Sequence, residues 1–115
     1  MDLVVLDTPD PAGLAAFYAE LLDWRVVRAD DDWITVRGPG ATGIAFQLAP
    51  HLVPPTWPKP DVPQQLHLDL DVADLDEAEA FVLSIGARKV PSDGADESFR
   101  VYLDPTGHPF CLCRA

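Results

Sequence analysis

Residues 66–77 read Leu-His-Leu-Asp-Leu-Asp-Val-Ala-Asp-Leu-Asp-Glu, and this stretch decides the fold. Apolar and polar residues alternate as far as Val72, which predicts a strand over 66–72 with two unlike faces. Asp74 is followed three residues later by Glu77, a capping-box arrangement, so a helix is expected to begin here. The residues that follow form an apolar stripe at helical spacing: Ala78, Phe81, Val82 and Ile85.

The beginning of the chain has the same pattern. Sliding the sequence over itself by 64 positions aligns residues 1–51 with 65–115 without a gap, and eleven of the 51 pairs are identical. Chance matching would give about a third of that number. The identical pairs include Asp10/Asp74, Phe17/Phe81, Asp32/Asp96, Thr42/Thr106, Gly43/Gly107 and Phe46/Phe110. The chain is therefore predicted to fold as two similar halves.

The first half opens with an apolar strand from Leu3 to Asp7, and Asp10 then precedes a proline suited to the first helical position. In the second half Gly86 is placed to end the helix. Three short strand candidates follow each helix: Trp24–Arg28, Trp33–Arg37 and Gly43–Leu48 in the first half, and Arg88–Val90, Phe99–Leu103 and Phe110–Cys113 in the second.

Residues 50–63 hold six prolines in fourteen residues, so they read as an extended connector. We predict one α+β domain, residues 1–115, built from two βαβββ modules. Module one spans 1–49 and module two spans 64–115. The modules are expected to form a cupped mixed sheet with the helices on its outer face.

Alternation along the strands predicts two different sheet faces. One face is entirely apolar and suits packing beneath the helices: Val4, Leu6, Ile44, Phe46, Leu48, Leu68, Leu70, Val72, Phe110 and Leu112. The opposite face mixes polar and apolar residues: Leu3, Val5, Ala45, Gln47, His67, Asp69, Cys111 and Cys113. Polar groups gathered among apolar neighbours are typical of a ligand cavity. A sheet face wetted by water is the alternative.

The net charge of the chain is −11, and no basic residues cluster. A nucleic-acid partner is therefore not expected, and neutral or cationic small ligands are favoured over anionic ones. The apolar runs are too short to span a bilayer, and the N-terminus lacks a basic region, so we expect no membrane partner, no signal peptide and a cytoplasmic location. Two cysteines two positions apart offer no disulfide framework.

Several motifs together resemble the glyoxalase-like branch of the vicinal oxygen chelate superfamily (glyoxalase, bleomycin resistance and extradiol dioxygenase proteins). The resemblance covers nearly the whole chain and rests on these stretches: Asp10-Pro11, Phe17-Tyr18, Leu21-Leu22-Asp23-Trp24, Pro55-Thr56-Trp57-Pro58, His67-Leu68-Asp69, Asp74-Leu75-Asp76, and Asp104-Pro105-Thr106-Gly107-His108-Pro109-Phe110-Cys111. It implies a cupped sheet, frequently in a homodimer, with a ligand or metal held inside the cup.

Enzymes of this superfamily place metal ligands on the first and last strands of each module. Mapped by the repeat, the resemblance assigns these positions to Leu3, Gln47, His67 and Cys111. Leu3 cannot coordinate a metal, and Gln47 is a weak oxygen donor. A hard cation such as Mg²⁺ would find too few oxygens, whereas zinc could use His67 with Cys111 and either Gln47 or Asp69.

His67 is the first candidate for chemistry. It is expected to bind a ligand or act as a general base, with Asp69 orienting its ring from the same face. A core histidine with satisfied hydrogen bonds is the alternative. Gln47, Trp57 and Cys111 are further candidate ligand-binding residues. Trp57 also suits a dimer interface, and Cys111 suits a small buried apolar residue.

The sequence favours a small-molecule binding protein with a degenerate metal site and a cavity around His67, without a cofactor. The competing hypothesis is a zinc- or nickel-dependent lyase or isomerase that uses His67 as a metal ligand. A metal-free enzyme with His67 as base, and a purely structural dimerisation module, are also open.

Overall fold

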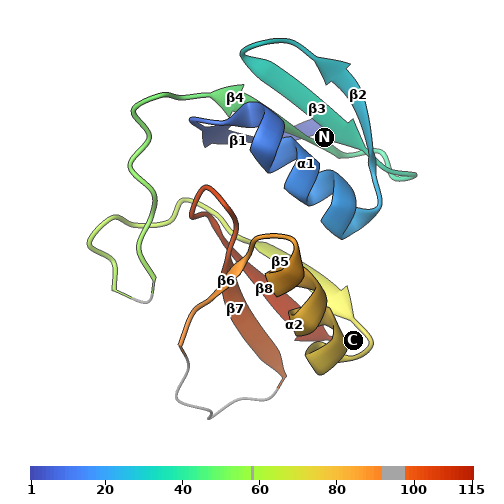
Figure 1. Cartoon of the computed structure of the whole chain (residues 1–115), viewed down its shortest axis with the longest axis vertical. Coiled ribbons are helices and arrows are strands. Elements are labelled where there is room, and N and C mark those ends of the chain that lie inside the picture. Colours follow the sequence, from blue (N-terminus) through green and yellow to red (C-terminus); the bar gives the residue numbers. More distant parts are fainter. Residues whose placement is uncertain (58, 92–97) are drawn as a thin grey trace. The chain divides into compact units, whose positions relative to one another are not determined.

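Two successive βαβββ units make up the structure, a computed structural model that describes residues 1–57, 59–91 and 98–115 (Figure 1). The first unit spans 1–52 and the second spans 53–115. Pro58 and Asp96, which entered the sequence analysis, lie outside the described residues. The elements are β1 (Leu3–Thr8), α1 (Pro11–Leu22), β2 (Arg25–Ala29), β3 (Trp33–Arg37), β4 (Gly43–Leu48), β5 (Leu68–Val72), α2 (Leu75–Ser84), β6 (Arg88–Lys89), β7 (Phe99–Leu103) and β8 (Pro109–Arg114).

The first unit is a four-stranded mixed sheet in the order β1-β4-β3-β2, with α1 packed on β3 and β4. β1 runs parallel to β4, and the other pairs are antiparallel. Asp10 caps α1 by accepting a 3.0 Å hydrogen bond from the Gly13 backbone N–H. Tyr18 of α1 stacks on Phe46 of β4 with ring centroids 5.6 Å apart, and both are buried. This contact joins the helix to the sheet.

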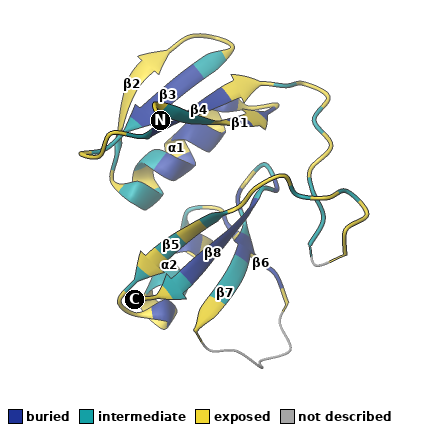
Figure 2. Cartoon of the chain, turned by 180° about the vertical axis from the view of Figure 1, so that it is seen from behind, coloured by how far each residue is buried: buried dark blue, intermediate teal, exposed yellow. Residues whose placement is uncertain are grey.

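The second unit repeats the architecture in the order β5-β8-β7-β6, with α2 packed on β8. Asp74 accepts a 3.1 Å hydrogen bond from the Glu77 N–H, and Gly86 follows the helix with a φ of 117°. The predicted two βαβββ modules are therefore confirmed, as are the predicted helix caps. In Figure 2 the edge strand β2 is exposed along its length, whereas β8 is mostly buried.

The predicted start of β5 and two predicted core positions are wrong. β5 begins at Leu68 rather than Leu66, so His67 lies just before the strand. Continuing the parallel register would place Pro109 of β8 opposite His67. Proline has no backbone N–H with which to extend the hydrogen-bonded ladder. Leu48 was expected on the sheet face beneath the helices and is 38% exposed, and Phe81 was expected in the apolar stripe of the second helix and is 41% exposed. Leu48 lies at the end of β4, and the buried residues of α2 are Leu75 and Val82.

The gapless repeat of 64 residues does not hold through the whole unit. It relates the first strands and the helix starts, because Thr8 and Val72 both end a strand two residues before a capping aspartate. The last two strands are related by 66 residues instead, since Trp33–Arg37 corresponds to Phe99–Leu103 and Gly43–Leu48 corresponds to Pro109–Arg114. The second unit therefore has two additional residues between the start of its helix and β7.

This shift changes which residues are equivalent. Val5 pairs with Ala45, and its counterpart Asp69 pairs with Cys111, so Ala45 is the structural counterpart of Cys111. The identities Thr42/Thr106, Gly43/Gly107 and Phe46/Phe110 do not relate equivalent positions. Because the shift is an even number of residues, the assignment of side chains to sheet faces survives it.

The Asp-Pro-Thr-Gly motif is a structural turn between β7 and β8. Asp104 is fully buried, and its Oδ1 accepts hydrogen bonds of 3.0, 2.9 and 3.0 Å from the backbone N–H groups of Thr106, Gly107 and His108. Gly107 has a φ of 109°, and a Cβ there would lie 2.9 Å from Pro54. The turn thus fixes the start of β8 and contacts the first residues of the connector.

A polar network joins α2 to the sheet on the outer side of the second unit. The Tyr102 hydroxyl donates a 2.8 Å hydrogen bond to Glu79, and Lys89 Nζ lies 2.8 Å from the same carboxylate. Arg100 lies 3.6 Å from Glu79 and 2.9 Å from Asp76. The hydrogen bond from Lys89 lowers the pKa of Glu79, with burial opposing it and Tyr102 adding to it.

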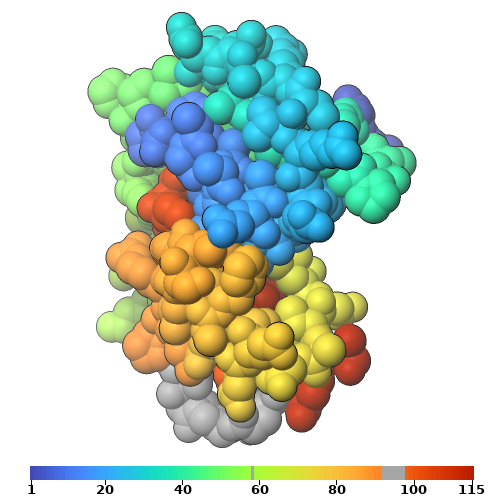
Figure 3. Space-filling view, turned by 45° about the vertical axis from the view of Figure 1, so that its right-hand side comes forward, coloured from blue at the N-terminus to red at the C-terminus, as the bar shows by residue number. Residues whose placement is uncertain are grey.

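On the face seen in the space-filling view, each unit forms a continuous surface of atoms (Figure 3). Within the described residues, neither helix has the length and apolar character needed to cross a membrane.

We predict that Gly107→Ala destabilises the protein by about 2 kcal/mol or more, because the residue needs a positive φ and its new Cβ would press on Pro54. Gly40→Ala is the matched control, since a Cβ there meets nothing within 4 Å and its change should stay within about 0.5 kcal/mol. Urea unfolding measures both. Equal destabilisation of the two variants would contradict the role of the turn.

A second prediction concerns acid stability. Because folding lowers the pKa of Glu79 below its ordinary 4.5, its stabilising effect is complete above that pH and disappears as pH falls through the lowered value. Glu79→Gln should therefore cost about 1 kcal/mol at pH 7 and distinctly less at pH 3. Urea unfolding at both pH values measures this, with the exposed Glu20→Gln as control. A cost that does not shrink at pH 3 would contradict the prediction.

Candidate functional site

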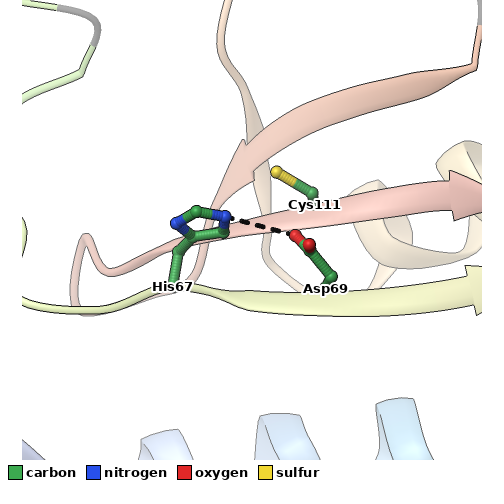
Figure 4. A group of neighbouring side chains, drawn as sticks. All are labelled: His67, Asp69 and Cys111. Carbon is green, nitrogen blue, oxygen red and sulfur yellow. Dashed lines mark ion pairs between the residues drawn. The ribbon is translucent and has the colours of Figure 1, made fainter.

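Three side chains with metal- or proton-binding atoms meet on one face of the second sheet (Figure 4). The parallel register sets Asp69 of β5 directly opposite Cys111 of β8. His67 lies two residues before Asp69 and so projects to the same side. The candidate ligand atoms of His67, Asp69 and Cys111 all lie within 4.8 Å of one another. Three residues that the sequence placed at the site are thus brought together.

Asp69 contacts both of its neighbours in this group. His67 Nε2 lies 3.3 Å from Asp69 Oδ1, and the His67 and Asp69 side chains are 36% and 60% exposed. Cys111 is only 4% exposed. Burial raises the pKa of the Cys111 thiol to about 12, and the charge of Asp69 and a hydrogen bond to it add to that effect. The thiol is therefore protonated near neutral pH, and it is a poor nucleophile.

The other ring nitrogen of His67 is also occupied. His67 Nδ1 lies 3.1 Å from the side-chain oxygen of Gln64. A side-chain amide can donate or accept after turning over, so Gln64 is compatible with either tautomer of the ring. Trp57 approaches the same ring edge-on, with centroids 5.7 Å apart and an interplanar angle of 76°. A ligand that bonds to Nδ1 must displace Gln64.

Gln64 is a residue that the sequence analysis missed. It lies at the end of the proline-rich connector, three residues before His67, and also lines a cavity of about 330 Å³. The remaining lining residues are all in the connector: Thr56, Trp57, Pro60 and Pro63. Nothing in the composition of the connector indicated a polar contact to His67, because a glutamine outside a strand has no periodic signal.

The equivalent face of the first unit carries no such group. Leu3 and Val5 correspond to His67 and Asp69, and the counterpart of Cys111 is the buried Ala45. The mapping of Gln47 onto Cys111 is wrong, because Gln47 lies two residues farther along β4, where it pairs with Asp7 and is exposed. A role for Gln47 in ligand binding stays a prediction.

The two tryptophans of the first unit have local packing contacts. The Trp33 indole N–H donates a 2.9 Å hydrogen bond to Thr35, and the Arg28 guanidinium lies 5.8 Å from the ring centroid. Trp24 covers Gly38 so closely that a Cβ there would be 2.2 Å from the indole nitrogen. Neither arrangement indicates a ligand.

The donor set of the second unit suits a transition metal only in part. Imidazole, thiolate and carboxylate are ligands that zinc accepts, but only one carboxylate is available to a hard cation. Zinc–ligand bonds of 2.0–2.3 Å place tetrahedral ligand atoms roughly 3.5 Å apart. A spread of up to 4.8 Å is larger than this, so the three side chains would have to close around the ion.

Comparisons with known proteins agree with this architecture. Residues 3–113 match the sequence profile of the family described as the glyoxalase-like domain. A glyoxalase/bleomycin resistance protein/dioxygenase family enzyme from Burkholderia phytofirmans PsJN is 17% identical, with a TM-score of 0.75 over 99% of this chain and 98% of that chain. No curated protein sequence matches the chain significantly.

Two further solved structures have the same fold. A glyoxalase-related enzyme from Fulvimarina pelagi is 16% identical, with a TM-score of 0.72 over 100% of this chain and 87% of that chain. The glyoxalase family protein from Enterococcus faecalis is 18% identical, with a TM-score of 0.73 over 99% of this chain and 96% of that chain. Likeness at these identities establishes the fold alone.

The electrostatics of Cys111 give a direct test. In a Cys113→Ser background, native protein at pH 8 should react slowly with iodoacetamide, because the Cys111 thiol is buried and has a raised pKa. Asp69→Asn removes the charge that contributes to this shift, so alkylation should accelerate by about threefold or more. Intact-mass spectrometry measures the rate.

Asp71→Asn is the matched control, because Asp71 raises the pKa of Cys113 and is not among the causes that act on Cys111. Equal rates in the two asparagine variants would show that Asp69 does not govern the thiol.

Proposed function

The chain belongs to the glyoxalase-like domain family, and from this premise we propose that it binds a small organic molecule on the polar face of the second unit, around His67. The metal centre implied for enzymes of the wider superfamily is incomplete in this chain. The observation that carries the proposal is the group His67, Asp69 and Cys111, which offers an imidazole, a carboxylate and a neutral thiol side by side.

Each member of the group supplies a different interaction. The exposed Asp69 carboxylate accepts hydrogen bonds and attracts positive charge, which together with the net charge of −11 favours neutral or cationic ligands. His67 is oriented by Asp69 through Nε2, so Nδ1 is the atom that can face a ligand once Gln64 moves aside. The buried thiol of Cys111 is unreactive and acts as a small apolar residue beneath the ligand.

The same pair of residues supports a metal-free reaction in which His67 acts as a general base. A carboxylate that fixes one ring nitrogen orients the other for proton transfer, and this is the requirement for such a base. General-base catalysis belongs to the same proposal, because ligand binding and proton transfer both need a ligand at Nδ1 of His67.

A zinc- or nickel-dependent lyase or isomerase is the second candidate, favoured by the grouping of three donor atoms within 4.8 Å. His67, Asp69 and Cys111 would hold the ion, which would supply Lewis-acid polarisation of a substrate oxygen. Two observations favour the first proposal over it. The Cys111 thiol would have to lose a proton against a raised pKa, and the first-unit residues equivalent to the group, Leu3, Val5 and Ala45, cannot coordinate an ion.

The two candidates make different predictions for purified protein. We expect zinc and nickel, measured by plasma mass spectrometry after dialysis, to lie far below one ion per chain. We also expect at least one neutral or cationic metabolite in a panel to raise the melting temperature by several degrees, as mass action requires at concentrations well above Kd.

His67→Ala should abolish that thermal shift, whereas the exposed His51→Ala should leave it intact. Stoichiometric zinc or nickel that is lost in His67→Ala and retained in His51→Ala would overturn the metal-free proposal in favour of the second candidate. If no metabolite in the panel raised the melting temperature, this would contradict both candidate functions and favour a purely structural module.

A further inference from the structure

The connector lines a partly open cavity rather than forming a plain extended link. Its volume is about 330 Å³, and its lining residues are Thr56, Trp57, Pro60, Pro63 and Gln64. The loop is closed by Thr56, whose N–H donates a 2.8 Å hydrogen bond to the Val62 carbonyl and whose hydroxyl accepts a 3.0 Å bond from the Val62 N–H. The Thr56 hydroxyl also donates to the Lys59 carbonyl. These bonds hold Thr56 next to Val62 and so keep the two ends of the loop together.

The walls of this cavity have a particular chemistry. Trp57 contributes a flat aromatic ring, and Pro60 and Pro63 contribute apolar rings. The hydrogen bonds of Thr56 are used within the loop, so Gln64 supplies the polar group available to a guest. None of the described lining residues is charged. Such walls suit a planar, neutral aromatic ring with one hydrogen-bonding atom.

Two residues that line the cavity also contact His67 of the candidate site. Trp57 contacts the His67 ring at 5.7 Å between centroids, and Gln64 contacts His67 Nδ1 at 3.1 Å. A molecule that occupies the cavity and bonds to Gln64 therefore sits where it can replace the contact between Gln64 and His67. The cavity volume is at the lower end of the range for small-molecule pockets, and this leaves room for a bicyclic ring.

We propose that the connector cavity binds a neutral, planar bicyclic aromatic group, stacked on Trp57 and hydrogen-bonded to Gln64. This inference rests on the proposed function and extends it, because it gives the class of ligand and assigns its recognition to the connector. His67 and Asp69 then interact with the polar substituent of the same molecule.

Quinoline is the probe for this inference, with cyclohexanol as the non-planar control. The indole N–H resonances of the three tryptophans report separately in ¹H–¹⁵N spectra of ¹⁵N-labelled full-length protein. Quinoline should shift the Trp57 indole resonance and leave those of Trp24 and Trp33 in place, since these two are packed against Gly38 and Thr35. Cyclohexanol should shift none of them.

Variants test the stacking contact. Trp57→Leu keeps an apolar side chain but removes the flat ring, so the quinoline Kd should rise by about tenfold or more. Trp57→Phe retains an aromatic face and should keep the Kd within about threefold of the wild type. An unshifted Trp57 indole in wild-type protein at about 1 mM quinoline would overturn the inference without any variant.

The outcomes also separate this inference from the proposed function. Quinoline could shift the backbone amides of residues 67–69 and 111 without moving the Trp57 indole resonance, and its affinity could be unchanged in Trp57→Leu. The proposed aromatic subsite would then be wrong. Binding around His67 then stands. The proposed function itself fails only through the metabolite panel and His67→Ala, which do not depend on quinoline.

Discussion

Parallel hydrogen bonding between β5 and β8 fixes where Asp69 and Cys111 of the candidate site point. The register that pairs Asp69 with Cys111 also pairs Leu68 with Phe110 and Leu70 with Leu112. Apolar residues thus face α2 while the carboxylate and the thiol share the other side. A slip of one residue would turn the apolar set away from the helix, so burial of Phe110 and Leu112 holds the site in register. The Asp104 turn supports this pairing by fixing the start of β8.

The two units share an architecture but have diverged in chemistry. Where the second unit has His67, Asp69 and Cys111, the first has Leu3, Val5 and Ala45. Small buried residues are kept at the Ala45 and Cys111 positions, which indicates a packing requirement common to both sheets. The charged member of the group, Asp69, lies at a position where the sheet face is exposed. The chemistry of this chain is therefore concentrated in its second unit and the connector that leads into it.

Electrostatics decide what this group of residues can do. Burial, together with the charge of Asp69 and a hydrogen bond to it, keeps the Cys111 thiol neutral, so Cys111 is not a thiolate. His67 has partners at both ring nitrogens, and one of these partners lines the connector cavity. Gln64 lines the cavity and contacts His67, so an apolar binding surface lies next to a titratable side chain. This combination suits a small molecule with a polar end.

Local pattern by itself determined much of the fold: the capping aspartates Asp10 and Asp74, the strands Trp33–Arg37 and Phe99–Leu103, and the side of the sheet on which His67, Asp69 and Cys111 lie. These follow from period-two and helical spacing, which short stretches of chain encode. Tertiary structure alone decided that Cys111 corresponds to Ala45 rather than Gln47, because strand register depends on loop lengths that identities do not reveal. It alone brought Gln64 and Trp57 to His67, since contacts made by an irregular connector depend on its folded path.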